Sequence, residues 1–389
     1  MPNKNKTIVI AAHKFLTQPD DDLVIYLTKE KYSKVAHITH GFPDAKDRVS
    51  KMSFFENGEL VKESRSIDLF GFPEPLIYIK EFISTVIYLV GLRTKIDLYI
   101  GMDGLLVFFG LILKRLGLIN KVVYWAMDFV PTQRFTGPFG TIKNYIYSTI
   151  NKYGYTHSDE MWDISPRMIQ ARQELLQVSA SSYKMSRLVP YGVWTSRISK
   201  IPYANCEKNT LVFMGHLLEK QGVQIVLQAL PDIVAKIPDF KFKIIGTGRY
   251  ENDLRQLAEK LGVSSYCSFL GKIESDIDLE NEIAKSCVAI APYVAELDKW
   301  TYYADPGKVK KYLACGVPVL LTDVPWNAKD IESSRCGKII TTDKDSIVNG
   351  ILDMMSSGTN QEFRENAIKY SFSYDYQVMF DNLFEQIKL

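Results

Sequence analysis

Three segments in the second half of the chain combine glycines with cations at points where a parallel strand would end. The first, Phe213–Gly222 (FMGHLLEKQG), ends an apolar run at Gly215 and places Lys220 just before a helix expected from Gln221. The free N–H groups and the dipole of a helix N-terminus bind phosphate, and a lysine adds positive charge. Taken alone, this segment is better explained as an ordinary loop between a strand and a helix.

The second segment, Ile245–Glu251 (IGTGRYE), supplies two glycines of a G-x-G-x-x-G pattern, at Gly246 and Gly248. Glu251 stands where the third glycine belongs, so the segment is a weak dinucleotide fingerprint. Glycines let a backbone approach a ligand closely, and they also permit a tight turn. Both interpretations stay open at this point.

The third segment begins a basic helix after the turn at Pro306–Gly307, and Lys308, Lys310 and Lys311 all fall in or near its first turn. Cations at that position oppose the helix dipole. An anion bound at the helix start would offset the repulsion, so the pattern predicts an anion site at Lys308. The alternative is a solvated basic face.

Together these segments resemble the nucleotide-sugar half of a GT-B glycosyltransferase of the family 4, or group 1, type. That family shows a G-R-x(n)-K-G loop, a G-x-G turn, an F-x-G, and a helix that ends A-x-G-x-P-V. This sequence has GHLLEKQG, GTG, FLG at Phe269–Gly271 and YLACGVPVLLTD, in that order. The resemblance covers about Leu211–Asp330, and the first half matches only as a generic Rossmann-like domain.

Several positions depart from the family pattern. His216 replaces the arginine after the first glycine, and Gln221 replaces the lysine before the second, with Lys220 one place earlier. The positions of the E-x7-E pair hold Tyr303 and Lys311. A lysine can only donate hydrogen bonds where a glutamate would accept them, so we expect Lys311 at the edge of the donor pocket.

Some family members carry a P-G-K helix start, which Pro306-Gly307-Lys308 fits. The resemblance therefore implies diphosphate binding through Lys220 and Lys308. The full set of donor-binding residues that it implies is Gly215, His216, Lys220, Gln221, Gly246, Gly248, Tyr303, Asp305, Pro306, Gly307, Lys308 and Lys311.

Two residues in the first half are candidates for the chemistry of transfer. Asp128 follows the expected strand Lys121–Trp125, where the family often places a polar residue that faces the donor across the cleft. His13 follows the expected first strand, Thr7–Ala12. A carboxylate or imidazole there could take the proton of an acceptor hydroxyl. The structural alternatives are a loop cap for Asp128 and a packing role for His13.

The elements that must position these residues alternate between short apolar strands and helices, which is typical of a parallel sheet covered on both faces. The alternation pauses at Val189–Val193, and a polar stretch continues to about Asn209 before it restarts. The sequence thus predicts an α/β protein with two doubly wound domains of similar size in tandem. The resemblance to GT-B enzymes implies that these are Rossmann-like domains facing a central cleft. We expect domains at 1–195 and 196–370, and a helix within 371–389 that crosses back to the first domain.

Composition excludes several classes of protein. The 389 residues carry a formal net charge of +2, so no charge excess favours nucleic acid. The five cysteines form no C-x-x-C motif and are expected to be free, buried thiols. The clusters Asp20–Asp22 and Asp276–Asp278 are interpreted as solvated turn residues, so no metal site is expected. No apolar run reaches the roughly 20 residues that a membrane-spanning helix requires.

The resemblance implies a hexosyltransferase that uses a UDP- or GDP-linked sugar, needs no cofactor, retains the anomeric configuration, and works in surface polysaccharide or glycoconjugate assembly. Its acceptor would be a glycan or a lipid-linked glycan. The expected location is the cytoplasm. Phe82–Leu92 and Gly104–Leu116 are apolar and flanked by cations, which would suit interfacial helices at the inner face of the membrane. The favoured alternative is that both stretches are helices packed on the first sheet. The alternatives are a catalytically silent nucleotide-sugar-binding subunit and, less favoured, a nicotinamide-dependent dehydrogenase.

Overall fold

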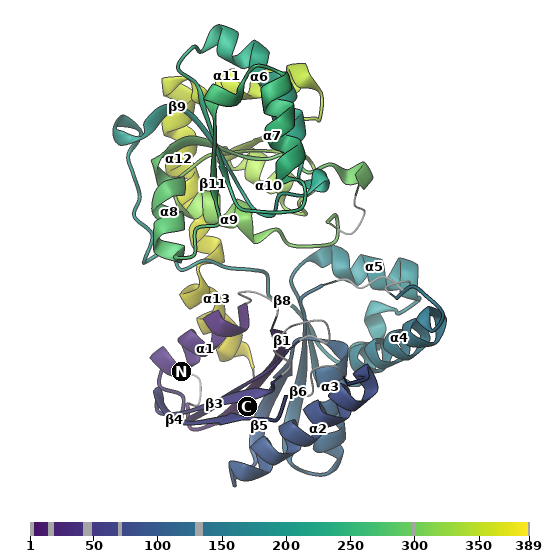
Figure 1. Ribbon diagram of the computed structural model, residues 1–389. Helices are drawn as coiled ribbons and strands as arrows, with labels where there is room; N and C mark the ends of the chain where they lie inside the picture. Colours follow the sequence, from purple (N-terminus) through teal and green to yellow (C-terminus); the bar gives the residue numbers. More distant parts are fainter. Residues whose placement is uncertain are drawn as a thin grey trace. The chain divides into compact units, whose positions relative to one another are not determined.

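The computed structural model describes residues 4–14, 19–41, 49–68, 72–128, 135–297 and 301–387 (Figure 1). The chain divides into two compact units. The first unit runs to Pro190 and regains the chain from Phe380 onward, and the second unit is Tyr191–Met379. The division falls inside the stretch Val189–Val193, where the sequence breaks its alternation of strands and helices.

The first unit is built on an eight-stranded sheet with the order β4-β3-β2-β1-β5-β6-β7-β8. Its strands are β1 (Thr7–Lys14), β2 (Lys34–Gly41), β3 (Lys51–Glu56), β4 (Glu59–Arg65), β5 (Ile96–Gly101), β6 (Ile119–Ala126), β7 (Glu160–Asp163) and β8 (Ser186–Leu188). The pairs that involve β3 are antiparallel, and the other pairs are parallel.

The β3–β4 hairpin departs from the parallel sheet that the sequence predicts. Asn57 and Gly58 connect its strands, with φ values of 50° and 91°. An Asn-Gly pair at positive φ is the usual two-residue hairpin turn. The Asn57-Gly58 pair is thus a hairpin signal that can be read from the sequence.

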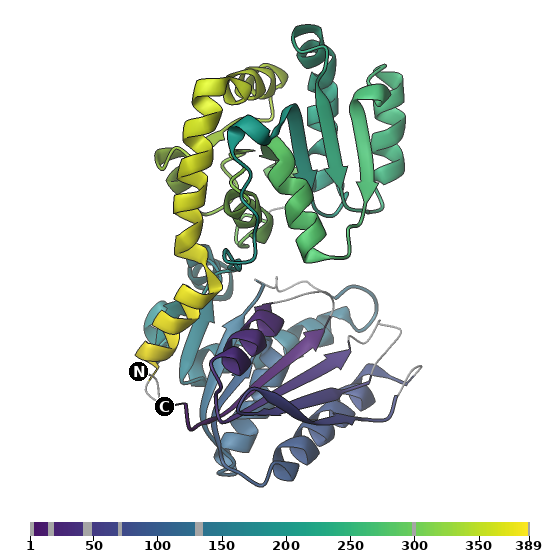
Figure 2. The ribbon, with the colours of Figure 1, turned by 90° about the vertical axis from the view of Figure 1, so that its left-hand side faces the viewer.

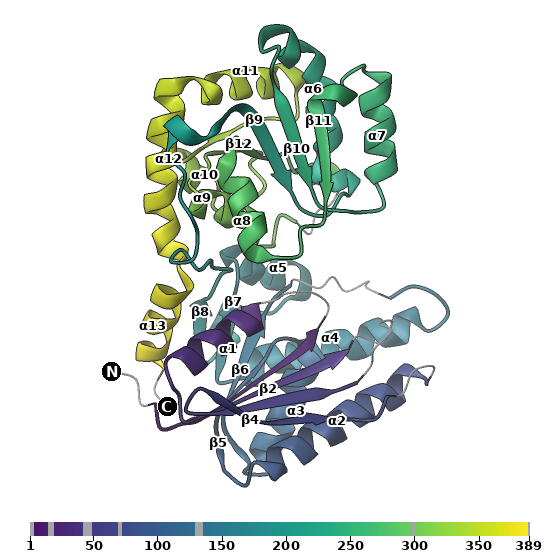
Figure 3. The same ribbon diagram turned by 60° about the vertical axis from the view of Figure 1, so that its left-hand side comes forward.

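Helices cover both faces of this sheet, as Figures 1 and 3 show. One face carries α1 (Pro19–Lys29) and α13 (Tyr376–Gln386), and the other carries α2 (Glu74–Gly91), α3 (Gly104–Arg115) and α4 (Gly140–His157); α5 (Pro166–Leu176) follows β7. The ring of Tyr26 in α1 packs on Phe380 and Phe384 of α13. The C-terminal helix thus returns to the first unit.

The second unit has a six-stranded, entirely parallel sheet with the order β11-β10-β9-β12-β13-β14. Its strands are β9 (Glu207–Met214), β10 (Lys241–Ile245), β11 (Cys267–Gly271), β12 (Ser286–Ala291), β13 (Val319–Leu321) and β14 (Gly337–Ile339).

Two apolar clusters, one on each face of this sheet, hold its helices. One face packs α6 (Val223–Lys236), α7 (Glu251–Lys260) and α11 (Lys344–Met355), and the other packs α8 (Asp276–Lys285), α9 (Gly307–Ala314), α10 (Ala328–Ser333) and α12 (Ser357–Ser371). Figure 2 shows α12 and then α13 in yellow, one after the other along the chain. The expected doubly wound α/β architecture is confirmed.

Both sheets reverse their strand order at one point. In the first unit β2 lies on one side of β1 and β5 on the other, and in the second unit β10 and β12 flank β9 in the same way. Open α/β sheets bind ligands at such a switch point, at the carboxyl ends of the strands. Ligand sites are therefore expected at the ends of β1 and β5 and at the ends of β9 and β12.

Candidate functional site

Lys308, the second residue of α9, lies at the switch point of the second unit. Its ammonium nitrogen is 4.3 Å from the centroid of the Phe213 ring near the end of β9. It is 4.4 Å from the centroid of the Tyr293 ring, which follows β12. It also donates a hydrogen bond to Gln221 Oε1 at 2.5 Å. The structure thus brings Lys308, Gln221 and the end of β9 together.

This ammonium group has no acidic partner in the part of the chain that the structure describes. Removal from water disfavours the charged form of a lysine, and burial lowers the pKa of Lys308 to about 7. An anion beside the nitrogen would favour the charged form again and offset the cost of desolvation. The surroundings of Lys308 would therefore suit an anion, and the anion site stays a prediction.

The glycines at the same edge serve contacts between neighbouring loops. Gly246 has a φ of +128°, and a Cβ there would lie 2.0 Å from the carbonyl oxygen of Gly215. A Cβ on Gly248 would lie 2.2 Å from the carbonyl oxygen of Leu217. The N–H of Gly246 donates to the carbonyl of Gly271 at 2.7 Å, which joins the β10 and β11 ends. The tight-turn interpretation of the G-x-G pattern explains these contacts.

Asp305, two residues before α9, accepts several hydrogen bonds that fix the local structure. Its buried carboxylate pairs with Lys310 Nζ at 2.5 Å and accepts a bond from the backbone N–H of Tyr191 at 2.7 Å. Its second oxygen accepts from the Trp326 indole at 2.9 Å. Lys310 also donates to the carbonyl of Tyr191 at 2.8 Å. These bonds fix the start of α9, and with it the position of Lys308.

Lys311 directs its ammonium at α8. The nitrogen lies 2.9 Å from Asp276 Oδ1 and 3.5 Å from Glu280 Oε1, and Arg197 contacts the same two carboxylates. The lysines of the predicted basic face therefore have different surroundings. Lys310 and Lys311 have acidic partners, and Lys308 faces aromatic rings and an amide. Of these three lysines, Lys308 is therefore the one whose charge opposes the helix dipole without an acidic partner among the described residues.

The remaining predicted donor residues lie on the segments that border this point. His216 is exposed directly after Gly215, Lys220 precedes Gln221 in a short 3-10 turn, and Tyr303 precedes α9. Pro306 is the N-cap residue of α9 and Gly307 its first residue. Their contacts to a donor stay predictions.

His13 lies at the switch point of the first unit, between two acids. Its Nδ1 is 2.6 Å from Asp103 Oδ2, and its Nε2 is 3.2 Å from Glu81 Oε2. Asp103 follows β5 and caps α3, because its other oxygen accepts from the N–H groups of Leu105 and Leu106. The bond between His13 and Asp103 thus connects the ends of the two strands that flank the switch.

The two carboxylates keep the imidazole protonated. Burial alone would lower the pKa of His13, but the charges and hydrogen bonds of Asp103 and Glu81 raise it to about 10. A protonated ring donates at both nitrogens and cannot accept a proton. In the free protein His13 therefore acts as a donor, which argues against the role of general base.

A second layer of polar groups surrounds this histidine. The His40 ring lies 5.7 Å from it, and His40 Nδ1 is 2.7 Å from Ser50 Oγ. Burial, followed by the charge of His13, lowers the pKa of His40, so this ring is neutral. Glu81 Oε1 is buried without a hydrogen-bond partner among the described residues. Glu81, His40 and Asp103 were not expected from the sequence, although Asp103-Gly104 at the start of an apolar run is a readable N-cap signal.

Asp128 is exposed two residues after β6, at the carboxyl edge of the sheet as expected. Residues 129–134, which follow it, lie outside the described part of the chain. Its role in catalysis stays a prediction.

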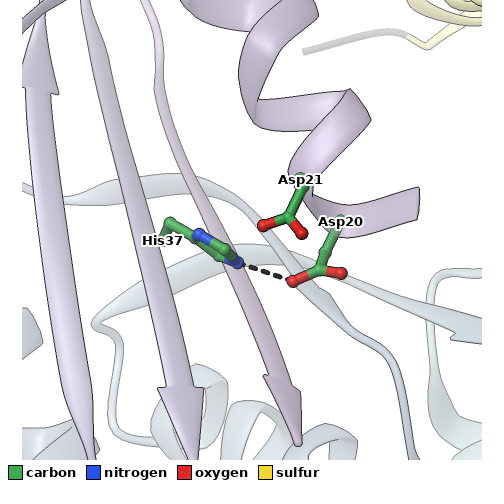
Figure 4. Close-up of side chains that lie close together, drawn as sticks. All are labelled: Asp20, Asp21 and His37. Atoms are coloured by element: carbon green, nitrogen blue, oxygen red, sulfur yellow. Dashed lines mark hydrogen bonds and ion pairs between the residues drawn. The ribbon is translucent and has the colours of Figure 1, made fainter. Parts of the chain in front are cut away.

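The acidic clusters were interpreted as residues of solvated turns, and the assignment to turns is wrong because both clusters lie in helices. Asp20 and Asp21 lie in the first turn of α1, and Asp276 and Asp278 in that of α8, where carboxylates complement the helix dipole. Asp20 is fully buried and lies 2.7 Å from His37 Nε2 (Figure 4).

Asp20, Asp21 and His37 could together offer three ligand atoms to a metal ion. However, the ammonium of Lys14 lies 3.3 Å from Asp20 Oδ2 and also contacts Asp21. This lysine supplies the positive charge that the acidic pair requires, so the cluster is explained as an ion-pair network.

The comparisons with known proteins agree with the geometry. The family description "glycosyl transferases group 1" matches residues 208–357. An uncharacterized glycosyltransferase of Haemophilus influenzae is 25% identical over 180 residues, which is 45% of each chain. A GDP-mannose-dependent alpha-(1-6)-phosphatidylinositol monomannoside mannosyltransferase of Mycolicibacterium smegmatis is 26% identical over 184 residues, 43% of this chain and 46% of the relative. The match thus spans less than half the length of these relatives.

Solved structures match over nearly the whole chain. WaaG, a glycosyltransferase involved in lipopolysaccharide biosynthesis, has a TM-score of 0.68 at 16% identity and covers 98% of this chain and 100% of its own. Sucrose-phosphate synthase of Thermosynechococcus elongatus has a TM-score of 0.71 at 15% identity, with 98% and 99% covered. HepE of Anabaena, solved with UDP, has a TM-score of 0.69 at 13% identity, with 97% and 98% covered.

The fold is therefore that of the GT-B glycosyltransferases. The segment 208–357, which holds the motifs singled out in the sequence, is similar to the group 1 glycosyl transferases.

Proposed function

We propose that the protein transfers a hexose from a nucleotide-diphosphate sugar, UDP- or GDP-linked, to a glycan or lipid-linked glycan acceptor. The observation that carries the proposal is the ammonium of Lys308, which lies at the switch point with a lowered pKa and without a described acidic partner. A diphosphate is the anion that the family's substrates would bring to this point. UDP in the HepE structure and GDP-mannose in the name of the mycobacterial relative support this donor class.

The departing diphosphate must be stabilised as its charge develops. Lys308 and the N-terminus of α9 supply positive charge on the protein itself, with Lys220 as the second predicted cation. We therefore propose a metal-independent transfer. Retention of the anomeric configuration follows from the family resemblance. Incubation with EDTA tests the first statement, and proton NMR of the first-formed product tests the second.

The acceptor is proposed to be attached to lipid or to a growing surface glycan. On α2, the apolar residues Leu76, Ile79, Ile83, Ile87 and Val90 are all exposed. On α4, Ile142, Tyr145 and Ile146 are exposed too, and Lys143 of α4 pairs with Glu74 of α2 at 2.9 Å. In contrast, α3 buries most of its apolar residues, so the expected interfacial role of Gly104–Leu116 is not supported.

A solvent-exposed apolar face edged by cations suits the surface of an anionic membrane. No helix in the described part of the chain combines the length and the apolar character needed to cross a bilayer. We propose peripheral contact through α2 at the inner face of the membrane. Sedimentation with anionic liposomes at low salt tests this, with the double variant I83D/I87D as the comparison. Equal recovery of both proteins in the supernatant would contradict it.

The second candidate function is a silent subunit that binds nucleotide sugar without transferring it. Lys311 favours it, because this residue stands where the family has a glutamate and is occupied by Asp276 and Glu280. A single experiment separates the two functions. The protein is incubated with radiolabelled UDP- and GDP-sugars and a mixed lipid extract, and bound donor, free nucleotide and product are measured. Product or donor hydrolysis supports the enzyme, and binding alone supports the silent subunit.

A further inference from the structure

Two of the five cysteines meet at the amino edge of the second sheet, the edge opposite Lys308. Cys206 directly precedes β9, and Cys287 is the second residue of β12. These strands are neighbours, and their register shifts between Ser286 and Val288, around Cys287. Both cysteines belong to the same buried cluster, and each thiol shifts the pKa of the other. Cys206 keeps 7% of its surface exposed and Cys287 1%.

A buried guanidinium without a carboxylate lies beside this pair. Arg364 is 3% exposed. In the described part of the chain its partners are all backbone carbonyl oxygens, including those of Ser286 at 2.9 Å and Ala284 at 3.1 Å. A buried cation without a counter-ion is costly. The groups that can become anionic and act on the pKa of Arg364 include both thiols, with Cys206 first and Cys287 second.

Other donors also surround the sulfur atoms. Lys208 Nζ lies 3.7 Å from Cys206 Sγ, and Asn360 Nδ2 lies 3.4 Å from Cys287 Sγ. The neighbouring Cys287 lowers the pKa of the Cys206 thiol most, burial raises it, and the charges of Arg364 and Lys208 lower it further. Burial instead raises the pKa of Cys267, the most exposed cysteine, to about 12. Cys206 is therefore the cysteine with the greatest thiolate character, and a thiolate is the reactive form.

We propose that Cys206 and Cys287 form a redox site that reacts with hydroperoxides and closes to a disulfide. The Cys206 thiolate attacks the O–O bond of hydrogen peroxide and becomes a sulfenic acid, and the released hydroxide takes a proton to give water. The Cys287 sulfur then attacks the Cys206 sulfur, the S–O bond breaks, and a second water leaves with the Cys287 proton. One peroxide is reduced by two electrons for each disulfide formed.

This site is independent of the proposed transferase activity, because it lies at the other edge of the sheet and uses none of the donor residues. Its disulfide would join the residue before β9 to the start of β12, at the amino edge of the sheet.

The test uses the full-length protein, which is exposed to an equimolar amount of hydrogen peroxide, alkylated and analysed by peptide mass mapping. The expected product is a Cys206–Cys287 cross-link that dithiothreitol reverses. In Cys287→Ala, Cys206 should stop at the sulfenic acid and be captured by dimedone. Cys267→Ser is the matched control and should cross-link like the unsubstituted chain.

A second measurement needs no substitution. Brief treatment of the folded, reduced protein with iodoacetamide at pH 7 should modify Cys206 at least about tenfold faster than the more exposed Cys267, since thiolate fraction outweighs exposure. Faster modification of Cys267 would overturn the proposal. Absence of the cross-link in peroxide-treated protein that keeps its native circular dichroism would overturn it as well.

Discussion

The two switch points share a topology and differ in charge. In the first unit, the imidazolium of His13 lies between Asp103 and Glu81, and its pKa is raised to about 10. In the second unit, the ammonium of Lys308 lies between two aromatic rings, and its pKa is lowered to about 7. The pKa shifts of these two cations are thus opposite in direction. The charge of His13 is compensated by two carboxylates of the protein, whereas the charge of Lys308 has no described acidic partner and would be stabilised by an anionic ligand.

This contrast suggests how the two units divide the proposed reaction. The second unit can hold the charged diphosphate of the donor. The first unit, with paired charges and a buried carboxylate oxygen on Glu81 that lacks a described partner, suits a ligand rich in hydroxyl groups.

The largest effect is expected at Asp128, after β6 in the first unit. Asp128→Asn keeps the shape and removes the negative charge that would take the acceptor's proton. General-base catalysis is worth about 10²- to 10⁴-fold, so turnover should fall by that amount with little change in donor affinity. Initial rates and donor binding are measured on the same preparation. A wild-type rate would exclude Asp128 as the group that takes the acceptor's proton.

Lys308→Ala should weaken the binding of UDP or GDP by roughly ten- to a hundredfold, since a hydrogen bond to a charged group contributes about 1.5–3 kcal/mol. Isothermal titration calorimetry measures the dissociation constants. Lys338→Ala is the control, because Lys338 is an exposed lysine of the same unit that pairs with Asp353. Equal affinities of the Lys308 variant and the control would remove Lys308 from the site.

The pH dependence of donor binding should follow the same lysine. Above a pH of about 7 the free protein loses the Lys308 proton, while a bound diphosphate favours the protonated form. The dissociation constant of a nucleotide sugar should therefore rise with pH, approaching tenfold per unit. The slope should disappear in Lys308→Ala. A flat profile in the unsubstituted protein would contradict the assigned charge state.

The smallest effect on nucleotide affinity is expected at Lys311, whose ammonium is occupied by Asp276 and Glu280. Lys311→Glu should not abolish nucleotide binding, but it removes these ion pairs and should lower the melting temperature. Thermal shift with and without nucleotide measures both effects. Stronger donor binding with higher turnover would show that the chain carries a weakened form of the family's site. Loss of both in a folded variant would show that Lys311 has a positive-charge role.

Periodicity predicted most of the fold because buried parallel strands are short apolar runs, as at Thr7–Ala12 and Lys121–Trp125. Lys308 was predictable because a Pro-Gly turn and a helix start are local signals. Contacts between distant parts of the chain were not predictable. The clamp of His13 by Glu81 joins residues from β1 and α2, and the thiol pair joins Cys206 to Cys287. Such pairs depend on the order and register of the strands, which cannot be predicted from a single sequence.

The charge state of Lys308 in the free protein is the central claim, and its direct measurement is a ¹³C NMR titration of the lysine side chains. The Lys308 signal is assigned from its loss in Lys308→Arg, and the titration is repeated with saturating UDP and GDP. We expect a pKa of about 7 for Lys308 without ligand and a clear rise when the diphosphate binds. An ordinary lysine pKa in the free protein that does not move with either nucleotide would contradict the account.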